Sequence, residues 1–147
     1  LSTAKGLAFT HNLPILPVSA FSILELATSH INFPKILFIR SHKDNIYYYN
    51  SKPDTSVTIE PEVNYGTVEE VLSSNHEIDH FYGDHEFSAI IERDGFEIIY
   101  PNAQLACSIA NDNFAKLKAM SRADMEPQYL TNFEAKKWKP GIKTKTN

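Results

Sequence analysis

The sequence predicts a mixed α/β domain, and three observations support this prediction. Short apolar runs interrupted by proline or glycine alternate with stretches of helical period. Their order along the chain is helix, strand, helix, then an antiparallel meander, then a strand and a helix, which favours a mixed sheet with flanking helices. A chain of 147 residues with 42% hydrophobic side chains can also bury a core.

The N-terminal segment is predicted to form a helix, a strand and a second helix. An apolar stripe at the helical period covers residues 2–12 and ends at Pro14, because proline cannot continue a helix. Residues 15–18 form an apolar run bounded by prolines, which indicates a buried strand. A serine that can cap free N–H groups opens the helix predicted over 19–29, with Glu25 facing solvent.

The middle of the chain is predicted to be an antiparallel meander. Residues 36–39 are continuously apolar, which is typical of a central strand buried on both faces. The polar turn 41–44 then leads into a strand over 45–49, rich in Ile and Tyr, in which Tyr48 faces away from its two tyrosine neighbours. We expect a third antiparallel strand at 57–59.

The last third is predicted to hold two helices and two strands. Thr67 and Glu70 have the spacing of a capping box, which predicts a short helix to about residue 73. Strands are expected over 78–82 and 96–100, followed by the longest helix over 103–120.

Charge and cysteine content narrow the classes of function. The net charge is −4, from 18 acidic and 14 basic side chains, which argues against a protein that binds nucleic acid through its overall charge. Residues 136–145 hold five lysines and no acid, and we interpret them as a solvated tail, with contact to RNA as the alternative. The single cysteine suits a reducing cytoplasm. No apolar run approaches the ~20 residues that span a bilayer.

We find no residues that indicate a catalytic, cofactor or metal site. One segment is rich in potential metal ligands, namely His76, Asp79, His80, Asp84, His85 and Glu86. A turn could bring His80 and His85 together, but their spacing matches no zinc motif, so we expect ordinary surface histidines. Cys107 lies in the apolar run LACSIA, and we predict a buried core residue and no nucleophile.

Two motifs resemble the TsaB (YeaZ-like) family of bacterial proteins, which take part in making threonylcarbamoyladenosine on tRNA. The opening LSTAKGLAF and the following LPILPVSAFSILELA match the family pattern at Lys5, Gly6, Leu7, Ala8, Pro14, Val18 and Ser19. The end of the chain matches the family's E-P-x-Y-L-R-N at Glu126, Pro127, Tyr129, Leu130 and Asn132. The two matches stand in the family's order and at its separation.

The resemblance implies an actin-like, Hsp70-like ATPase fold of the ribonuclease H-like type, truncated at the N-terminus. Residues 1–135 would be a partial domain, in which 1–30 end the N-terminal lobe and 31–135 form the C-terminal lobe, and 136–147 would be a flexible basic tail. The first helix also lacks a capping residue before Leu1. We therefore expect the sequence to be the latter part of a longer protein.

The family resemblance also implies a function without catalysis. TsaB-like proteins act as scaffolds that pair with the catalytic subunit TsaD and activate it, the ATPase TsaE joins them, and tRNA is met only through the complex. The implied partner contacts are Ala4, Lys5 and Ala8 on the first helix, where the small side chains and Gly6 would allow close approach. The alternative is that Ala4, Leu7 and Ala8 face the core. Self-association could also cover this helix.

The hairpin after the central strand departs from the family. Arg40, His42 and Asn45 stand where the family usually has Asp, Arg and Glu. These differences leave open the hypothesis that the chain is a degenerate, inactive remnant. A separate alternative is a small nucleotide-binding or hydrolytic enzyme of the same superfold. A role in proteolysis, which an old label of the family suggested, has no supporting residues.

Overall fold

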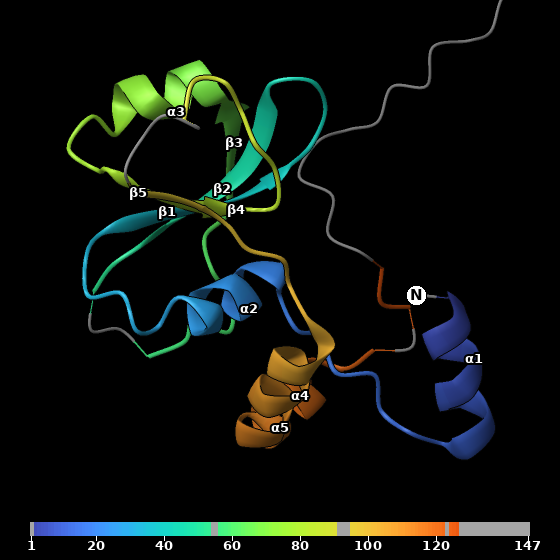
Figure 1. The fold of residues 1–147 in the computed structure, drawn as a ribbon. Helices are drawn as coiled ribbons and strands as arrows, with labels where there is room; N and C mark the ends of the chain where they lie inside the picture. The colour runs from blue at the N-terminus through green and yellow to red at the C-terminus, as the bar shows by residue number, and fades with distance from the viewer. Residues whose placement is uncertain (1, 54–55, 91–94, 123, 127–147) are drawn as a thin grey trace, which may run out of the picture.

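The computed structural model describes residues 2–53, 56–90, 95–122 and 124–126, and these form a five-stranded mixed sheet with helices on both faces (Figure 1). The helices are α1 (Ser2–His11), α2 (Ala20–Ala27), α3 (Val68–Ser74), α4 (Ala103–Asp112) and α5 (Phe114–Met120). The strands are β1 (Lys35–Arg40), β2 (Asn45–Ser51), β3 (Asn64–Thr67), β4 (His80–Gly83) and β5 (Gly95–Ile98). Among the helices described, none has the length and apolar character to cross a membrane.

The sheet has the strand order β3-β2-β1-β4-β5. Strands β1, β2 and β3 are joined by antiparallel pairing, whereas β4 pairs in parallel with both β1 and β5. The central position of β1 agrees with its sequence, because Ile36, Leu37 and Phe38 are all 0% exposed. The prediction of a central strand buried on both faces is confirmed.

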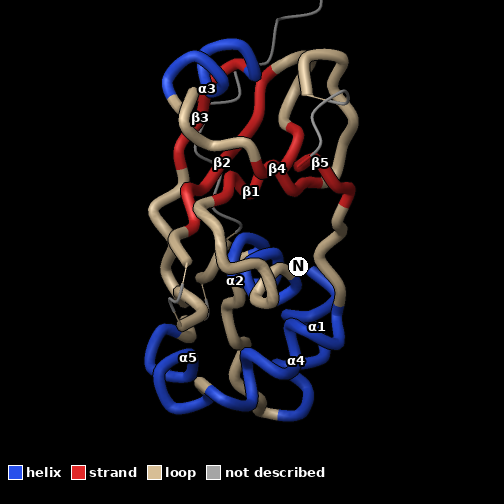
Figure 2. The backbone as a smooth tube through the Cα atoms, turned by 60° about the vertical axis from the view of Figure 1, so that its left-hand side comes forward, coloured by secondary structure: helices blue, strands red, loops and turns tan. Residues whose placement is uncertain are grey.

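Each face of the sheet is covered by a helix with an apolar side (Figures 1 and 2). On one face, Val68 and Val71 of α3 pack against the β1 side chains that point towards α3. On the other face, Phe21 and Leu24 of α2 pack against Leu37. The helices α4 and α5 continue this second layer, since their buried Ile109 and Leu117 cluster with Ile23 on α2.

Local signals in the sequence placed several elements correctly. The side chain of Ser19 accepts a hydrogen bond from the Phe21 backbone N–H, so it caps α2 as predicted. Thr67 and Glu70 form both hydrogen bonds of a capping box at the start of α3. Tyr48 packs with the α3 side of the sheet, while Tyr47 and Tyr49 pack with the α2 side, as the alternation of a strand requires.

Two predicted strands are wrong. Residues 15–18 form no strand and are only half-buried. Residues 57–59 form no strand either, and the third antiparallel strand is β3 instead. The backbone of Thr58 makes its hydrogen bonds with side chains of α2, donating to Glu25 and accepting from Ser22. These bonds replace the ladder that a strand would have made.

The predicted single helix over 103–120 is also wrong, because it is interrupted at Asn113. This residue has φ −119° and ψ 24°, which lie outside the helical range. Its backbone N–H and its side-chain amide both donate to the Ile109 carbonyl oxygen, at 3.0 Å each. Asparagine competes with helix continuation through such local bonds, so α5 begins anew at Phe114.

Glu25 is buried, in contradiction to the prediction that it faces solvent. It is 4% exposed, and its carboxylate accepts hydrogen bonds from Thr58 N at 2.6 Å, Ser51 Oγ at 3.1 Å and Tyr49 Oη at 3.3 Å. A buried carboxylate is tolerated only with such donors around it. Glu25 therefore joins α2 to the end of β2 and to the segment around Thr58.

A buried lysine stands near this carboxylate. Lys35 is 3% exposed, and its Nζ donates to the carbonyl oxygens of Thr28 at 2.7 Å and Ile31 at 3.0 Å, which follow the end of α2. Burial lowers the pKa of Lys35, and the negative charge of Glu25 acts in the opposite direction. Lys35 thus joins β1 to the end of α2, and Glu25 joins α2 to the end of β2.

Replacing Glu25 by alanine should destabilise the fold. We expect the free energy of unfolding to fall by about 2 kcal/mol or more, since a buried donor that loses its acceptor costs about 1–3 kcal/mol. Urea unfolding followed by circular dichroism measures this loss. The matched control is Glu77→Ala, whose side chain is 88% exposed, and it should change stability by less than about 0.5 kcal/mol. Equal effects of the two substitutions would contradict the role assigned to Glu25.

A second substitution tests the packing between β1 and β4. A Cβ atom added at Gly83 would lie 2.5 Å from the Phe38 ring, and this ring is fixed by Phe87 and Phe96, with centroids at 5.9 and 6.4 Å. Gly83→Ala should therefore lower the free energy of unfolding by about 1–3 kcal/mol through overpacking.

The control for this substitution is Gly66→Ala on β3, where the nearest atom to an added Cβ lies at 3.4 Å. Thermal unfolding of both variants decides the matter. A Gly83→Ala protein as stable as the Gly66→Ala protein would show that Phe38 is free to move.

Candidate functional site

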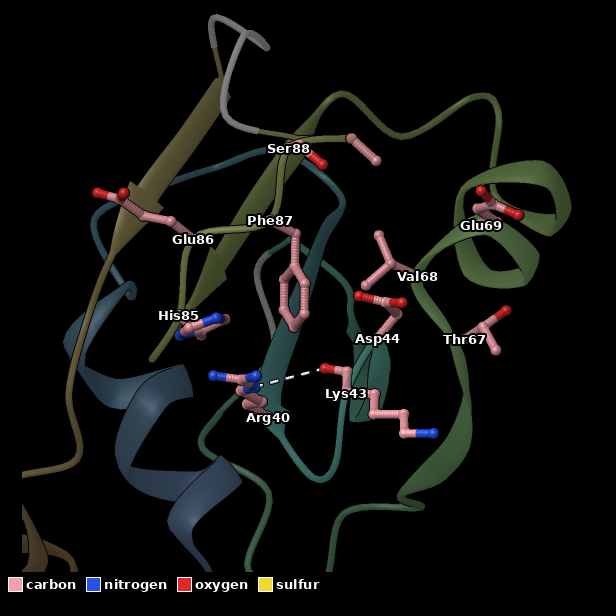
Figure 3. A pocket seen from close by; sticks show the side chains of 11 residues that line it. Arg40, Lys43, Asp44, Thr67, Val68, Glu69, His85, Glu86, Phe87 and Ser88 are labelled. Carbon is pink, nitrogen blue, oxygen red and sulfur yellow. Dashed lines mark hydrogen bonds between the residues drawn. The ribbon is translucent and has the colours of Figure 1, made fainter.

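The pocket that we take as the candidate site lies where β1 and β4 end, and its volume is about 480 Å³ (Figure 3). Its walls come from three segments that are distant in sequence. These are the turn after β1, with Arg40, Lys43 and Asp44; the start of α3, residues 67–69; and the loop after β4, residues 85–89.

The topology of the sheet explains why a pocket forms there. β1 and β4 are parallel neighbours, in register from Lys35 opposite His80 to Phe38 opposite Gly83. After β1 the chain turns towards β2, whereas after β4 it continues towards β5 on the other side. Connections that leave neighbouring parallel strands in opposite directions open a crevice at the carboxyl ends, where α/β proteins commonly bind ligands.

One hydrogen bond joins the two strand ends at this crevice. Asp84, directly after β4, accepts a hydrogen bond from the Arg40 backbone N–H through Oδ1 at 2.8 Å. The residues that depart from the family pattern also shape the turn. The Arg40 Nε donates to the Lys43 carbonyl oxygen at 3.4 Å, and Asn45 Nδ2 donates to the His42 carbonyl oxygen at 3.1 Å. Lys43 has a positive φ of 55°, which places it in the left-handed region.

Charges of both signs line the pocket, on different sides of an aromatic floor. Phe87 is buried beneath, with the His85 ring set edge-on at 4.8 Å between centroids. Figure 3 shows the Arg40 guanidinium beside His85 at one end of the pocket and Asp44 beyond Phe87 towards α3. Within the described residues, neither Arg40 nor Asp44 forms an ion pair.

The histidine-rich segment does not form one cluster. His76 is 78% exposed and lies 4.0 Å from the Glu77 carboxylate. His80 stacks on Phe33, with ring centroids 5.1 Å apart, and its buried Nδ1 has no hydrogen-bond partner among the residues that the structure describes. His85 belongs to the pocket. In the described part of the chain, no three His, Cys, Asp or Glu side chains are placed to hold a metal ion together.

The predicted partner-binding residues lie on α1, which forms a second candidate surface. α1 buries none of its residues: Ala4 is exposed, and Lys5 and Ala8 are half-buried. Leu7 and Phe9 are 61% and 89% exposed. The alternative prediction, in which Ala4, Leu7 and Ala8 face the core, is wrong for the described structure. The apolar side chains of α1 are available for contact.

The remaining residues of the family motifs have mixed outcomes. Pro14 follows the end of α1 and is exposed, and the space around Gly6 is open, with no atom within 4 Å of an added Cβ. Glu126 is exposed. Pro127, Tyr129, Leu130, Asn132 and the basic tail lie outside the described residues. The close helix approach predicted at Gly6 is therefore not made by this chain's described residues.

The prediction for Cys107 is wrong, because this residue is exposed. The buried side of α4 is set by Ile109, which is 3% exposed. On a helix, a residue two positions away points to another side. The apolar neighbours of Cys107 in the sequence were therefore a poor guide to its burial.

Sequence reasoning missed Asp44 and Phe87 as pocket residues. It considered Asp84, His85 and Glu86 only as metal ligands. The available signal was position, since the runs RSHKD and GDHEF each follow directly after a predicted apolar strand. Recognising the pocket also required knowing that these two strands are parallel neighbours.

Comparison with solved structures places the fold among YeaZ-like proteins. The structure of an uncharacterized protein with similarity to peptidase YEAZ from Pseudomonas aeruginosa is similar to this chain, with a TM-score of 0.66 and 17% sequence identity. The match covers 88% of this chain but 65% of that protein, so the chain spans less than two thirds of its length. Comparisons with protein-family models and with curated proteins found no match.

Proposed function

We propose that this chain is part of a non-catalytic, YeaZ-like scaffold subunit that pairs with and activates a TsaD-like catalytic subunit in the cytoplasm. A TsaE-like ATPase would join the pair, and the complex would modify tRNA to threonylcarbamoyladenosine. The support is the YeaZ-like fold, the family motifs at both ends of the sequence and the state of α1. The last of these is the observation on which the proposal chiefly rests.

The exposure of α1 favours a binding partner for this helix. A helix of ten residues is marginal in water by itself, because helices below about 12–15 residues gain too little from propagation. Helices in proteins are stabilised mainly by burial of an apolar side. α1 has apolar side chains but buries none of them against the described residues, and Figure 1 shows it standing away from the sheet.

The small residues of α1 favour another helix as the contact. Ala4 and Ala8 are four positions apart and therefore lie on one side, next to Leu7. Side chains of this size let a second backbone approach closely, and Leu7 supplies apolar area at the same contact. We assign this surface to the TsaD-like subunit. A second copy of the chain is the competing occupant.

Two substitutions on α1 should weaken pairing with the TsaD-like subunit. Leu7→Asp places a charge in the apolar contact, and Ala4→Arg blocks close approach. Because both positions are exposed in the chain alone, we expect unchanged folding but at least ~10-fold weaker binding, as for a central interface residue. Affinity is measured by titration of this chain with the cognate TsaD-like subunit.

The matched control is Phe114→Asp on α5, which alters an exposed apolar side chain of another helix, 48% exposed. It should leave the affinity unchanged. Wild-type protein that shows no association with the TsaD-like subunit would refute the proposal. Sedimentation of the chain alone distinguishes the other occupant, since a dimer dissociated by Leu7→Asp, with no TsaD-like binding, assigns α1 to self-association.

A further inference from the structure

We propose that the pocket at the ends of β1 and β4 binds a small zwitterion of the amino-acid class. The ligand's carboxylate would lie at Arg40 and His85, and its ammonium group at Asp44. This binding site is separate from the α1 surface and does not depend on the scaffold function proposed above. Three features of the pocket lead to this assignment.

The first feature is an exposed arginine at the end of β1 whose terminal nitrogens are unused within the described residues. The Arg40 backbone is anchored by Asp84, and its Nε is directed to the Lys43 carbonyl oxygen. Among the described residues, no hydrogen bond or ion pair engages its two terminal nitrogens. A guanidinium positioned in this way can bind a carboxylate through two parallel hydrogen bonds. His85 stands beside it as a second donor (Figure 3).

The second feature is a carboxylate on the far side of the pocket. The Asp44 carbonyl oxygen accepts a hydrogen bond from the Val68 N–H at 2.9 Å, which ties this turn to the start of α3. Its side chain forms no ion pair within the described residues, although Arg40 lines the same pocket. The two opposite charges are thus more than 4.0 Å apart by the ion-pair distance and are separated by Phe87 (Figure 3). A ligand that has both charges can satisfy both groups.

The third feature is the overall charge of the lining, which disfavours a polyanion. Arg40 and Lys43 are basic, whereas Asp44, Glu69 and Glu86 are acidic, so the acidic groups are in excess when His85 is neutral. Figure 3 also shows that the Lys43 and Glu86 side chains both point away from Phe87. A nucleotide polyphosphate would meet repulsion here, whereas a single carboxylate next to Arg40, with an amine next to Asp44, would not.

Size and polarity agree with a ligand of this class. A volume of about 480 Å³ falls within the ~300–1,000 Å³ usual for small-molecule sites. It exceeds the volume of a glycine or alanine and leaves room for a larger side chain. Phe87, Val68 and Ala89 also line the pocket and offer apolar contact for that side chain.

Calorimetric titration of the full chain with the common L-amino acids and a dipeptide such as Ala-Ala tests the proposal. We expect saturable binding of at least one of them. For a ligand that binds, its N-acetyl derivative lacks the ammonium group and its amide lacks the carboxylate. Each should bind at least ~10-fold more weakly, because it leaves one charged group of the pocket without its partner.

Variants assign the two ends of the ligand. Arg40→Gln should weaken binding of the zwitterion about 10-fold or more, and it should have little further effect on the amide. Asp44→Asn should weaken the zwitterion similarly but leave the N-acetyl derivative unaffected. Lys116→Gln, an exposed lysine on α5, is the control and should bind as the wild type does. Thermal unfolding checks that each variant is folded.

Three results would overturn the assignment. The first is no binding of any amino acid or of the dipeptide at the highest soluble concentration. The second is zwitterion binding that Arg40→Gln and Asp44→Asn both leave unchanged. The third is tighter binding of pyrophosphate or ATP than of any zwitterion. If Arg40→Gln fails to fold, Asp44→Asn and the two derivatives still decide the result.

Discussion

The buried carboxylate of Glu25 is the interaction on which the layered arrangement depends. It lies on α2 and accepts hydrogen bonds from two side chains at the end of β2, Tyr49 and Ser51, and from the Thr58 backbone. A carboxylate out of water needs such donors, so these hydrogen bonds hold the three segments together. Lys35 makes a second connection, because its Nζ donates hydrogen bonds to carbonyl oxygens that follow the end of α2. With α2 held under the sheet, α4 and α5 have a surface on which to pack.

The pairing of β1 with β4 in the sheet determines where the pocket forms. The close parallel pairing of β1 with β4 depends on the absence of a side chain at Gly83, where the Phe38 ring lies. The loops after these strands then separate, and Asp84 holds the Arg40 backbone at the point of separation. The two candidate surfaces of the protein therefore differ in kind. The pocket is built by the core, whereas α1 lies outside it.

The structural features that depend only on neighbouring residues could be predicted from the sequence. Caps at Ser19 and Thr67, the apolar run of β1 and the alternation around Tyr48 all depend on neighbouring residues, and the structure bears them out. The predictions were wrong where contacts with residues distant in the sequence determine the structure. Glu25 reads as a surface residue because its donors lie about 24 to 33 positions away. The only sign of the break at Asn113 in the sequence is the tendency of asparagine to form local hydrogen bonds. The residues around it have a helical period, which favoured the prediction of one continuous helix.

The two candidate sites differ in the same way, since one depends on neighbouring residues and the other on contacts between distant ones. Ala4 and Ala8 could be named from a motif because the whole of α1 is one continuous segment. The pocket could not, since it requires the turn after β1 and the loop after β4 to be neighbours. That relation follows from the strand order, which the predicted meander did not specify. The acidic and histidine residues near 84–86 were noticed, but their partner across the pocket, Asp44, was not.

The central claim is that α1 is stabilised by a partner subunit and not by this chain. Amide hydrogen exchange of this chain tests it most directly, with and without the TsaD-like subunit. We predict that α1 amides exchange much faster than those of α2 in the protein alone, and that they become protected when the subunit is added. Protection of α1 equal to that of α2 in the protein alone, or exchange that the subunit leaves unchanged, would contradict the account.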